Sequence, residues 1–196
     1  LVEFIDVVRQ SGLCEEIEIC SNGSLLHKVS DEVFSRIDSL SVSWYPDERC
    51  DKEKIDIAKA KSSEFGFRLK VEKIGTFRVM EPAVPIADQT LVKRIYQSCE
   101  IAHTWGCQTF YKGSFYLCSR PLFLNSYLAG LGVQDRDYRQ EDGLPIHQAG
   151  LKRRLEAYLR RSDPLASCAR CYGTVGRIQP WRGLSADERR HPVAKP

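Results

Sequence analysis

Cysteine placement is the feature of this sequence that most restricts its fold. Five of the eight cysteines lie in the second half of the chain, at Cys99, Cys107, Cys118, Cys168 and Cys171. The first three precede or flank a predicted β-hairpin, and the last two form a C-x-x-C pair further on. A cysteine-bearing hairpin followed by a distant C-x-x-C pair is a spacing typical of metal sites. A shared metal centre requires the fold to bring these segments to one place.

The segment between Cys107 and Cys118 predicts two antiparallel strands. Aromatic and β-branched residues flank Lys112-Gly113, a two-residue turn that contains glycine. In that register Cys107 lies directly opposite Cys118, about 4.5–5.5 Å away, which suits two thiolates of one metal centre. Hairpin geometry therefore favours Cys107 as a ligand.

Disulfide bonds are the alternative, since the number of cysteines is even. No signal peptide opens the sequence and the composition is that of a cytosolic protein, so we expect a cytoplasmic protein with reduced thiols. We expect Cys14, Cys20 and Cys50 to be small buried apolar groups outside the metal site. The histidines stand alone in the sequence, and such residues are more often surface or satisfied core residues than ligands.

The first part of the chain alternates predicted strands with predicted helices. Strands are predicted at 16–20, 41–45 and 67–71, and helices at the start of the chain, at 31–40 and at 51–65. This alternation is typical of βαβ units and a parallel sheet. Ligands of such sheets bind at the carboxyl ends of the strands.

Polar residues lie at the ends of these predicted strands. Ser21 and Asn22 follow the first strand, Ser43 lies in the second, and Lys70 and Glu72 lie at the end of the third. A bound ligand is one interpretation of this placement. The alternatives are an ordinary Asn-Gly turn, an ordinary strand serine and a pair of surface charges.

Prolines near residues 82–85 interrupt the alternation, so we place a domain boundary there, between 1–85 and 86–196. Beyond it we expect a helix at 88–97, the hairpin, a weaker apolar stretch at 122–131, a polar loop at 135–145 and a helix at 147–161. The fold class expected is α/β for the first domain, followed by a small α+β cysteine-rich portion.

The charge pattern argues against two classes of partner. The formal net charge is only +3, and the basic residues near the end of the chain alternate with acidic ones. We expect a solvated helix face there and no nucleic-acid partner. No apolar run approaches the roughly 20 residues that span a bilayer, so we expect no membrane partner.

These features together resemble the later part of a radical S-adenosylmethionine (radical SAM) enzyme. Such enzymes often carry a C-terminal extension of the SPASM type or of the shorter twitch type. The signature of the extension is a Cys, a spacer, a Gly, four residues and a second Cys. Cys99, thirteen residues, Gly113 and Cys118 fit it, whereas Cys107 leaves a spacer of five residues. The later C-x-x-C pair matches the twitch arrangement.

The resemblance implies a fold and a metal centre. Residues 1–85 would form the C-terminal part of a partial (β/α)6 barrel, similar to a TIM barrel, and residues 86–196 would form the extension. The extension would hold an auxiliary [4Fe-4S] cluster, for which we expect the ligands Cys99, Cys118, Cys168 and Cys171. Cys107 competes with Cys99 for the fourth position.

The resemblance also implies S-adenosylmethionine (SAM) as a cofactor, near Ser21, Asn22 and Ser43. The C-x-x-x-C-x-x-C loop and the Gly-Gly-Glu motif that define the family are absent from this sequence. Because the first residue is Leu1 and the chain opens within a helix pattern, we expect a C-terminal piece that generates no radical alone.

Two functions remain open at the level of sequence. The first is a radical SAM oxidoreductase that modifies an unidentified small molecule or peptide, with a flavodoxin or ferredoxin as reductant. The second is a structural zinc module without redox chemistry, since four Cys thiolates suit Zn²⁺ as well as iron.

Overall fold

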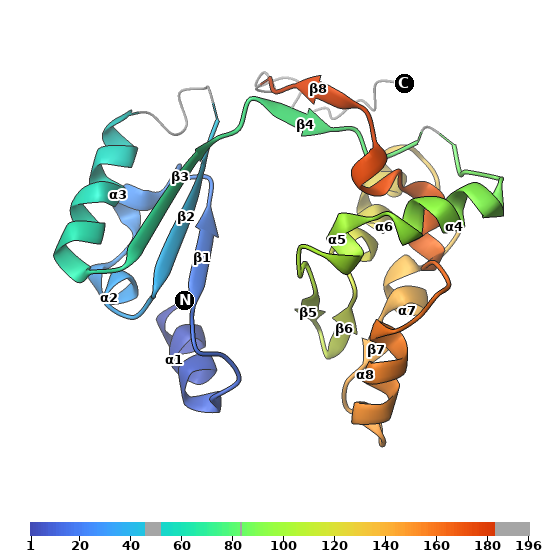
Figure 1. Cartoon of the computed structure of the whole chain (residues 1–196), viewed down its shortest axis with the longest axis horizontal. Helices are drawn as coiled ribbons and strands as arrows, with labels where there is room; N and C mark the ends of the chain where they lie inside the picture. The colour runs from blue at the N-terminus through green and yellow to red at the C-terminus, as the bar shows by residue number, and fades with distance from the viewer. Residues whose placement is uncertain (46–51, 83, 183–196) are drawn as a thin grey trace. The chain divides into compact units, whose positions relative to one another are not determined.

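The computed structural model describes residues 1–45, 52–82 and 84–182. These residues form a mixed α/β structure with three small sheets (Figure 1). The described chain divides into two compact units, which we call unit 1 (residues 1–77 and 180–182) and unit 2 (residues 78–179). The division falls at 77–78, before the predicted boundary at 85–86. Strands β4 (Thr76–Arg78) and β8 (Ile178–Pro180), in which the chain passes from one unit to the other, pair with each other.

Unit 1 is built on a three-stranded parallel sheet, as the alternating pattern predicted. Its strands are β1 (Glu18–Ser21), β2 (Ser39–Trp44) and β3 (Arg68–Lys73), in that spatial order. The connections hold η1 (Leu26–Lys28), α2 (Asp31–Phe34) and α3 (Lys52–Phe65), and α1 (Val2–Ser11) precedes the sheet. The described strands close no barrel.

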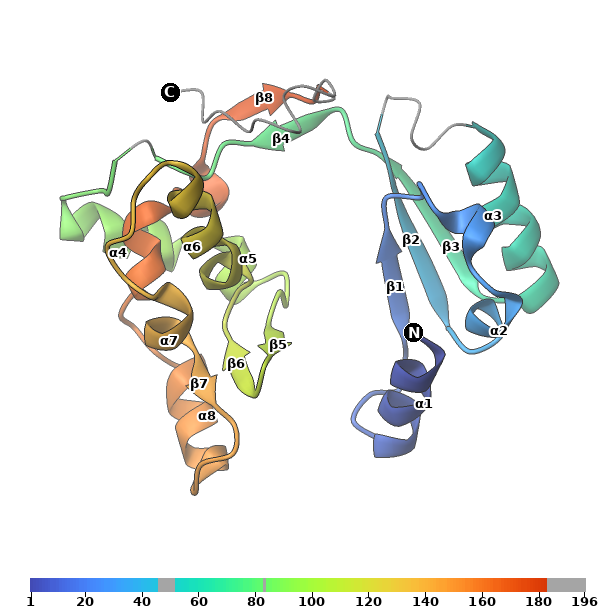
Figure 2. The same cartoon turned by 180° about the vertical axis from the view of Figure 1, so that it is seen from behind.

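One face of this sheet is apolar and carries the core of unit 1. Leu40 and Val42 of β2 are 2% and 1% exposed, and α3 covers them with Ile55 and Ala58. Figures 1 and 2 show α2 and α3 on the same side of the sheet. Burial of each large apolar side chain stabilises the fold by about 1.5–3 kcal/mol. The period-2 pattern of β2 is therefore what fixes its register against the helices.

The opposite face of the sheet is polar and exposed, and it corrects one prediction. Cys20 of β1 lies on this face and is exposed, in register with Ser41 and Lys70. The Ser41 hydroxyl donates to the Glu18 carboxylate. Cys14 is also exposed, so the prediction that Cys14 and Cys20 are buried is wrong. Cys50 lies outside the described residues.

The predicted helix at 31–40 is wrong in its second half. The helix α2 ends at Phe34, and Ser39 and Leu40 already belong to β2. The Asp38 carboxylate accepts a hydrogen bond from the Ile17 N–H at 2.7 Å, which holds the entry to β2 against the entry to β1. Long-range strand pairing therefore overrides the local helical spacing. Ser30 occupies the N-cap position of α2, but its side chain makes no capping hydrogen bond.

Unit 2 is mainly helical around a second small sheet. Its elements in chain order are α4 (Gln89–Gln97), α5 (Glu100–His103), β5 (Thr109–Tyr111), β6 (Ser114–Tyr116), α6 (Arg120–Gly130), α7 (Tyr138–Asp142), β7 (Leu144–Pro145), α8 (Leu151–Leu159), η3 (Ala166–Arg170) and η4 (Gly173–Val175). The predicted helix at 88–97 is confirmed, with Asp88 as its N-cap. The Asp88 carboxylate accepts from the N–H groups of Thr90 and Leu91.

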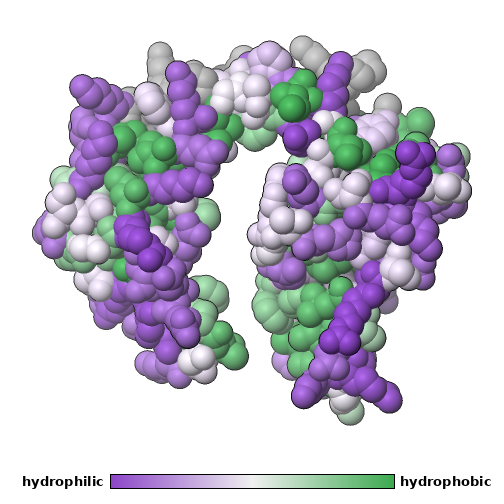
Figure 3. Space-filling model, in the orientation of Figure 1, coloured by the Kyte–Doolittle hydropathy of each residue, from purple (hydrophilic) through white to green (hydrophobic). Residues whose placement is uncertain are grey.

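The predicted hairpin is confirmed in its register. Strand β5 pairs with β6 in an antiparallel ladder in which Phe110 faces Phe115. Lys112 and Gly113 both adopt positive φ angles, 43° and 76°, which the two-residue hairpin turn requires. Figure 3 shows hydrophobic residues exposed over this hairpin, where Phe110 is 67% exposed.

The polar loop predicted at 135–145 is wrong, because it contains α7 and β7. Asp137 caps α7 by accepting from the N–H groups of Arg139 and Gln140. Tyr138 and Asp142 are buried at 2% and 3% exposure, although polar neighbours surround them in the sequence. The helix predicted at 147–161 is shorter and covers 151–159. None of the described helices is both long enough and apolar enough to cross a membrane.

Candidate metal centre

Four cysteines from separate segments of unit 2 line one pocket, which we call the cysteine pocket. They are Cys99, Cys118, Cys168 and Cys171. The remaining lining is mostly apolar and includes Ile95, Tyr96, Ile101, Ala102 and Leu165. The pocket holds about 420 Å³ of empty space, part of it open to solvent. The structure thus brings together the four cysteines that the twitch spacing predicted as ligands.

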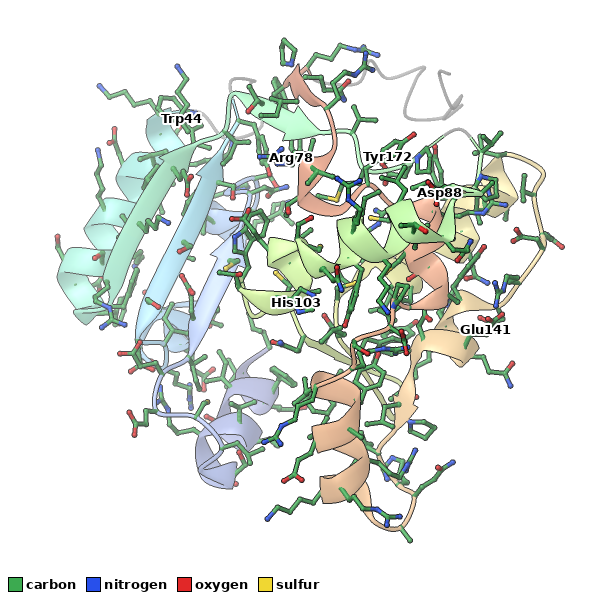
Figure 4. The ribbon with its side chains drawn as sticks, turned by 45° about the vertical axis from the view of Figure 1, so that its right-hand side comes forward. Trp44, Arg78, Asp88, His103, Glu141 and Tyr172 are labelled. Carbon is green, nitrogen blue, oxygen red and sulfur yellow. The ribbon has the colours of Figure 1, made fainter. Side chains whose placement is uncertain are left out.

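Each of these cysteines lies at the end of a local element or within a tight turn. Cys99 precedes α5, whose N–H groups at Ala102 and His103 bond to its carbonyl oxygen. Cys118 follows β6 and accepts a hydrogen bond from the Arg120 N–H, which partly offsets the rise in its pKa that burial causes. Figure 4 labels Asp88, His103 and Tyr172, which mark the start of α4, the end of α5 and the residue after Cys171.

The C-x-x-C pair occupies the short helix η3 and its end. Cys168 lies within η3, and the N–H of Cys171, which ends η3, donates to the Cys168 carbonyl at 3.1 Å. The Gly173 N–H then donates to the Cys171 Sγ at 3.2 Å. A Cβ on Gly173 would lie 3.1 Å from the Cys99 Sγ, and Gly173 has φ +52°. Glycine is therefore needed where the Cys99 and Cys171 segments approach each other.

A buried carboxylate from α7 holds this pair in place. Asp142 accepts from the backbone N–H groups of Ala166 and Ser167, at 2.7 and 2.9 Å, and so caps η3 from outside. Burial raises the pKa of Asp142, while hydrogen bonds from Ser167 and Ala166 act in the opposite direction. Tyr158 of α8 donates to the Asp142 carbonyl and accepts from the Leu117 N–H. Hydrogen bonds thus connect both the Cys168 segment and the Cys118 segment to Asp142 of α7.

An ion pair also connects η3 to the segment that precedes α7. Arg170 is 7% exposed, and its guanidinium lies 2.6 Å from the Asp135 carboxylate. Its Nε–H donates to the Tyr138 hydroxyl at 3.2 Å. Sequence reasoning missed Asp142 and Asp135, which it assigned to a polar loop, and it gave Arg170, between the two cysteines of the C-x-x-C pair, no role. Their partners lie 24 to 35 residues away in the chain.

Burial favours the protonated form of three pocket thiols, those of Cys118, Cys168 and Cys171. Burial, with a smaller contribution from the neighbouring thiols of Cys171 and Cys99, raises the pKa of Cys118 to about 12. Burial likewise raises the pKa of Cys168 and of Cys171. Metal ligation requires thiolates, so binding of a cation must displace these protons.

One residue that lines the pocket has a buried hydrogen-bond donor without a partner in the described part of the chain, and this bears on whether the pocket suits an anionic group. Arg120 lines the pocket, and its Nε is buried without a hydrogen-bond partner in the described part of the chain. Its NH2 group pairs with Glu81 at 2.7 Å. Buried donors are almost always satisfied, so an acceptor that the described residues do not supply is expected beside this Nε. An anionic metal–sulfur group fits this requirement.

Cys107, the competing ligand, does not line the cysteine pocket. It is half-buried, and its thiol points to the Trp105 carbonyl at 4.0 Å. The described pairing of the hairpin ends at Thr109 and Tyr116, so the predicted pair of Cys107 with Cys118 is not part of it. The iron content of Cys99→Ala and Cys107→Ala variants would decide between these two cysteines as the fourth ligand.

The spacing of the side chains bears on the kind of metal. Among the described residues, no three His, Cys, Asp or Glu side chains are grouped so that they could hold one metal ion. A single Zn²⁺ bound by four thiolates would place their sulfur atoms about 3.8 Å apart, as Zn–S bonds of about 2.3 Å require. The ligands of a [4Fe-4S] cluster bind separate irons and stand wider apart. Four thiolates are a donor set used both by iron–sulfur clusters and by structural zinc sites.

The residues predicted near SAM lie in unit 1, apart from this site in the chain. The Ser21 hydroxyl accepts from the Gly23 N–H, and the Asn22 side chain accepts from the Ser24 N–H, both at 3.1 Å. These are local turn contacts. Ser43 stands in register with Glu72, which pairs with Lys70 at 3.3 Å.

Comparison with protein families finds no matching family model, and comparison with curated proteins finds no relative. The chemistry of the cysteine pocket is therefore the basis for a function.

Proposed function

We propose that the cysteine pocket binds a [4Fe-4S] cluster through Cys99, Cys118, Cys168 and Cys171. The observation that carries this proposal is the convergence of four cysteines, distant in sequence, on one largely apolar pocket. Thiolates are the ligands of such clusters. The orphan donor of Arg120 in the wall adds a group that favours an anionic occupant.

The chain's own residues determine what the site can do. A cluster held by these four thiolates would have no iron open to substrate and would supply a one-electron acceptor. The apolar wall, with Leu165 at 3% and Tyr96 at 2% exposure, limits water. The Gly173 N–H donates to the Cys171 sulfur and stabilises its thiolate form. These are features of an electron-transfer site.

We further propose that the whole protein is a radical SAM oxidoreductase, of which this chain holds the auxiliary-cluster part. The electron accepted at the cysteine pocket would come from a substrate radical, so the substrate is oxidised. The parallel order of β1, β2 and β3 and their polar, exposed face support a barrel wall. SAM near Ser21, Asn22 and Ser43 is part of this proposal. So are an unidentified small-molecule or peptide substrate, a flavodoxin or ferredoxin reductant and a cytoplasmic location.

Anaerobic reconstitution of the chain with iron and sulfide tests the metal centre. We expect about four iron and four sulfide ions per chain, and a brown protein that absorbs broadly near roughly 400 nm. A Cys118→Ser variant should lose most of the colour, whereas Cys14→Ser, at an exposed thiol outside the pocket, should keep it. Equal iron content in both variants would refute the assignment.

The alternative is a structural zinc site on the same four thiolates. It requires the sulfur atoms to move closer together, since they form no single-ion site in this structure. One tightly bound zinc per chain, and a colourless protein after reconstitution with iron and sulfide, would establish it in place of the cluster.

A further inference from the structure

Two arginine Nε atoms are buried without partners in the described part of the chain, and they differ in position. They belong to Arg120 and Arg139. Arg120 lines the cysteine pocket, whereas Arg139 lies in α7 and lines a separate, open groove. Of these two arginines, only Arg120 therefore lines the proposed metal centre.

The placement of Arg120 follows from the chain. It is the first residue of α6, and its backbone N–H donates to the sulfur of Cys118. Its guanidinium reaches Glu81, 2.7 Å away, with 19% of the arginine side chain and 28% of the glutamate side chain exposed. The ion pair with Glu81 uses NH2 and leaves the buried Nε–H free.

Arg120 also lines the same pocket as a second cysteine, Cys171. Arg120 thus contacts the Cys118 segment through its backbone and carries its positive charge in the wall that Cys171 shares. A partly desolvated cation beside thiolates interacts more strongly than a cation in water.

We propose that Arg120 sets the reduction potential of the proposed cluster. Its Nε–H donates a hydrogen bond to a thiolate or sulfide sulfur, and Glu81 moderates its charge. This inference rests on the proposed function. The couple takes up one electron, from the substrate radical in the enzyme or from dithionite in the test, and no proton moves. A cation and a hydrogen bond both favour the reduced, more negative form, because hydrogen bonds to the sulfurs tune such potentials.

The direction of the shift in reduction potential distinguishes Arg120 variants from Glu81 variants. Arg120→Gln removes the charge and should make reduction harder, whereas Glu81→Gln leaves the Arg120 charge unopposed and should make reduction easier. Arg120→Lys keeps the charge but not the Nε–H, so its potential should lie between those of wild type and Arg120→Gln. Arg139→Gln is the matched control, because it removes the other orphan Nε away from the pocket.

The experiment is a dithionite titration of the reconstituted chain under anaerobic conditions, followed by electron paramagnetic resonance. For Arg120→Gln we expect at least a tenfold lower ratio of reduced to oxidised cluster at a fixed potential, equal to a shift of about 59 mV. Glu81→Gln should shift the other way, and Arg139→Gln should match wild type. A purely structural role of Arg120 would reduce cluster content without this pair of opposite shifts.

The outcomes are distinguishable from failure of the proposed function. A wild-type chain that takes up no iron and sulfide refutes the function itself. If the wild type loads the cluster but Arg120→Gln and Glu81→Gln have the same reduction potential as the wild type, the role of Arg120 is refuted and the proposed function stands. If Arg120→Gln fails to load, Glu81→Gln decides, because it retains Arg120: an unchanged potential there overturns the inference.

Discussion

At the scale of single residues, the cysteine pocket depends on residues other than its four cysteines. Gly173 provides room for the Cys99 sulfur and an N–H for the Cys171 sulfur. Arg120 provides the orphan donor in the wall. Such supporting groups orient ligands and tune a metal, so they matter nearly as much as the ligands.

The choice between Cys99 and Cys107 belongs to this scale. We expect Cys99→Ala to lose most of the bound iron, because its thiol lines the pocket. Cys107→Ala should retain wild-type iron and cost only about 1 kcal/mol of stability, as a small truncation does. The measurement is iron per chain in the two variants, prepared side by side. Loss of iron in Cys107→Ala alone would restore the cross-strand pair of the hairpin.

The ion pair of Asp135 with Arg170 predicts a dependence of stability on pH. The hydrogen bond and charge of Arg170 lower the pKa of Asp135 below its ordinary value of 3.8. The folded state therefore holds the carboxylate form more strongly than the unfolded state does. The stabilisation is complete above the unfolded-state pKa and is lost as the pH falls through the lower, folded-state value.

Asp135→Asn checks this dependence. Its melting temperature should fall less steeply than that of wild type between pH 5 and pH 3, the region about the ordinary value of 3.8. Lys93→Gln, which removes an exposed pair with Asp163, serves as control, since such surface pairs contribute little. Parallel pH profiles for wild type and Asp135→Asn would show that the pair does not contribute.

At the scale of elements, η3 is held by a cap that comes from another helix. Asp142 at the end of α7 supplies the acceptor that a short helix needs at its N-terminus, and its carboxylate is nearly inaccessible to water. A helix of five residues has little stability alone, so its geometry depends on this contact. The position of Cys168 depends on it in turn.

We expect Asp142→Asn to destabilise unit 2 by about 1–3 kcal/mol, the cost of leaving a buried hydrogen-bonding group unsatisfied. Asparagine has one acceptor oxygen for the N–H groups of Ala166 and Ser167. Its NH₂ group, itself a donor, would face the N–H group that lost its acceptor. Asp163→Asn is the control, since the Asp163 side chain is 76% exposed and should change stability by no more than about 0.5 kcal/mol. Chemical denaturation measures both variants. Equal denaturation midpoints for Asp142→Asn and Asp163→Asn would contradict the role of Asp142 as a cap.

At the scale of the whole molecule, each unit has a hydrophobic core of its own. Unit 1 buries Phe34, Leu40 and Val42 between its sheet and helices. Unit 2 buries Tyr96 and Leu117 beside the cysteine pocket, together with further apolar residues. Binding of the proposed cluster would contribute folding energy to unit 2, because its four cysteines come from distant segments of that unit.

Calorimetry of the loaded and metal-free chain checks this assignment. We expect two thermal transitions, of which removal of iron lowers only one, by at least several degrees. Cys118→Ser should reproduce the metal-free trace, because it removes a ligand outright. A uniform shift of the whole trace would show that the two cores unfold as one cooperative unit.

The sequence by itself determined the features that depend on neighbours in the chain. Gly12 and Gly66 end their helices with φ of 63° and 77°, Asp88 caps α4, and Lys112-Gly113 makes the hairpin turn. Each relies on hydrogen bonds or backbone angles within a few residues, which local propensity encodes. The alternation of strands and helices likewise predicted the parallel sheet.

Only the tertiary structure decided the rest, because the deciding contacts join residues far apart in the chain. Pairing of β2 with both neighbouring strands shortened the helix predicted at 31–40. The uncovered sheet face left Cys20 exposed. Burial against η3 turned Asp142 from an expected loop residue into a cap. The cysteine spacing predicted which thiols would meet, but the fold supplied the groups that hold them: a glycine, a carboxylate and an arginine whose partners no local pattern specifies.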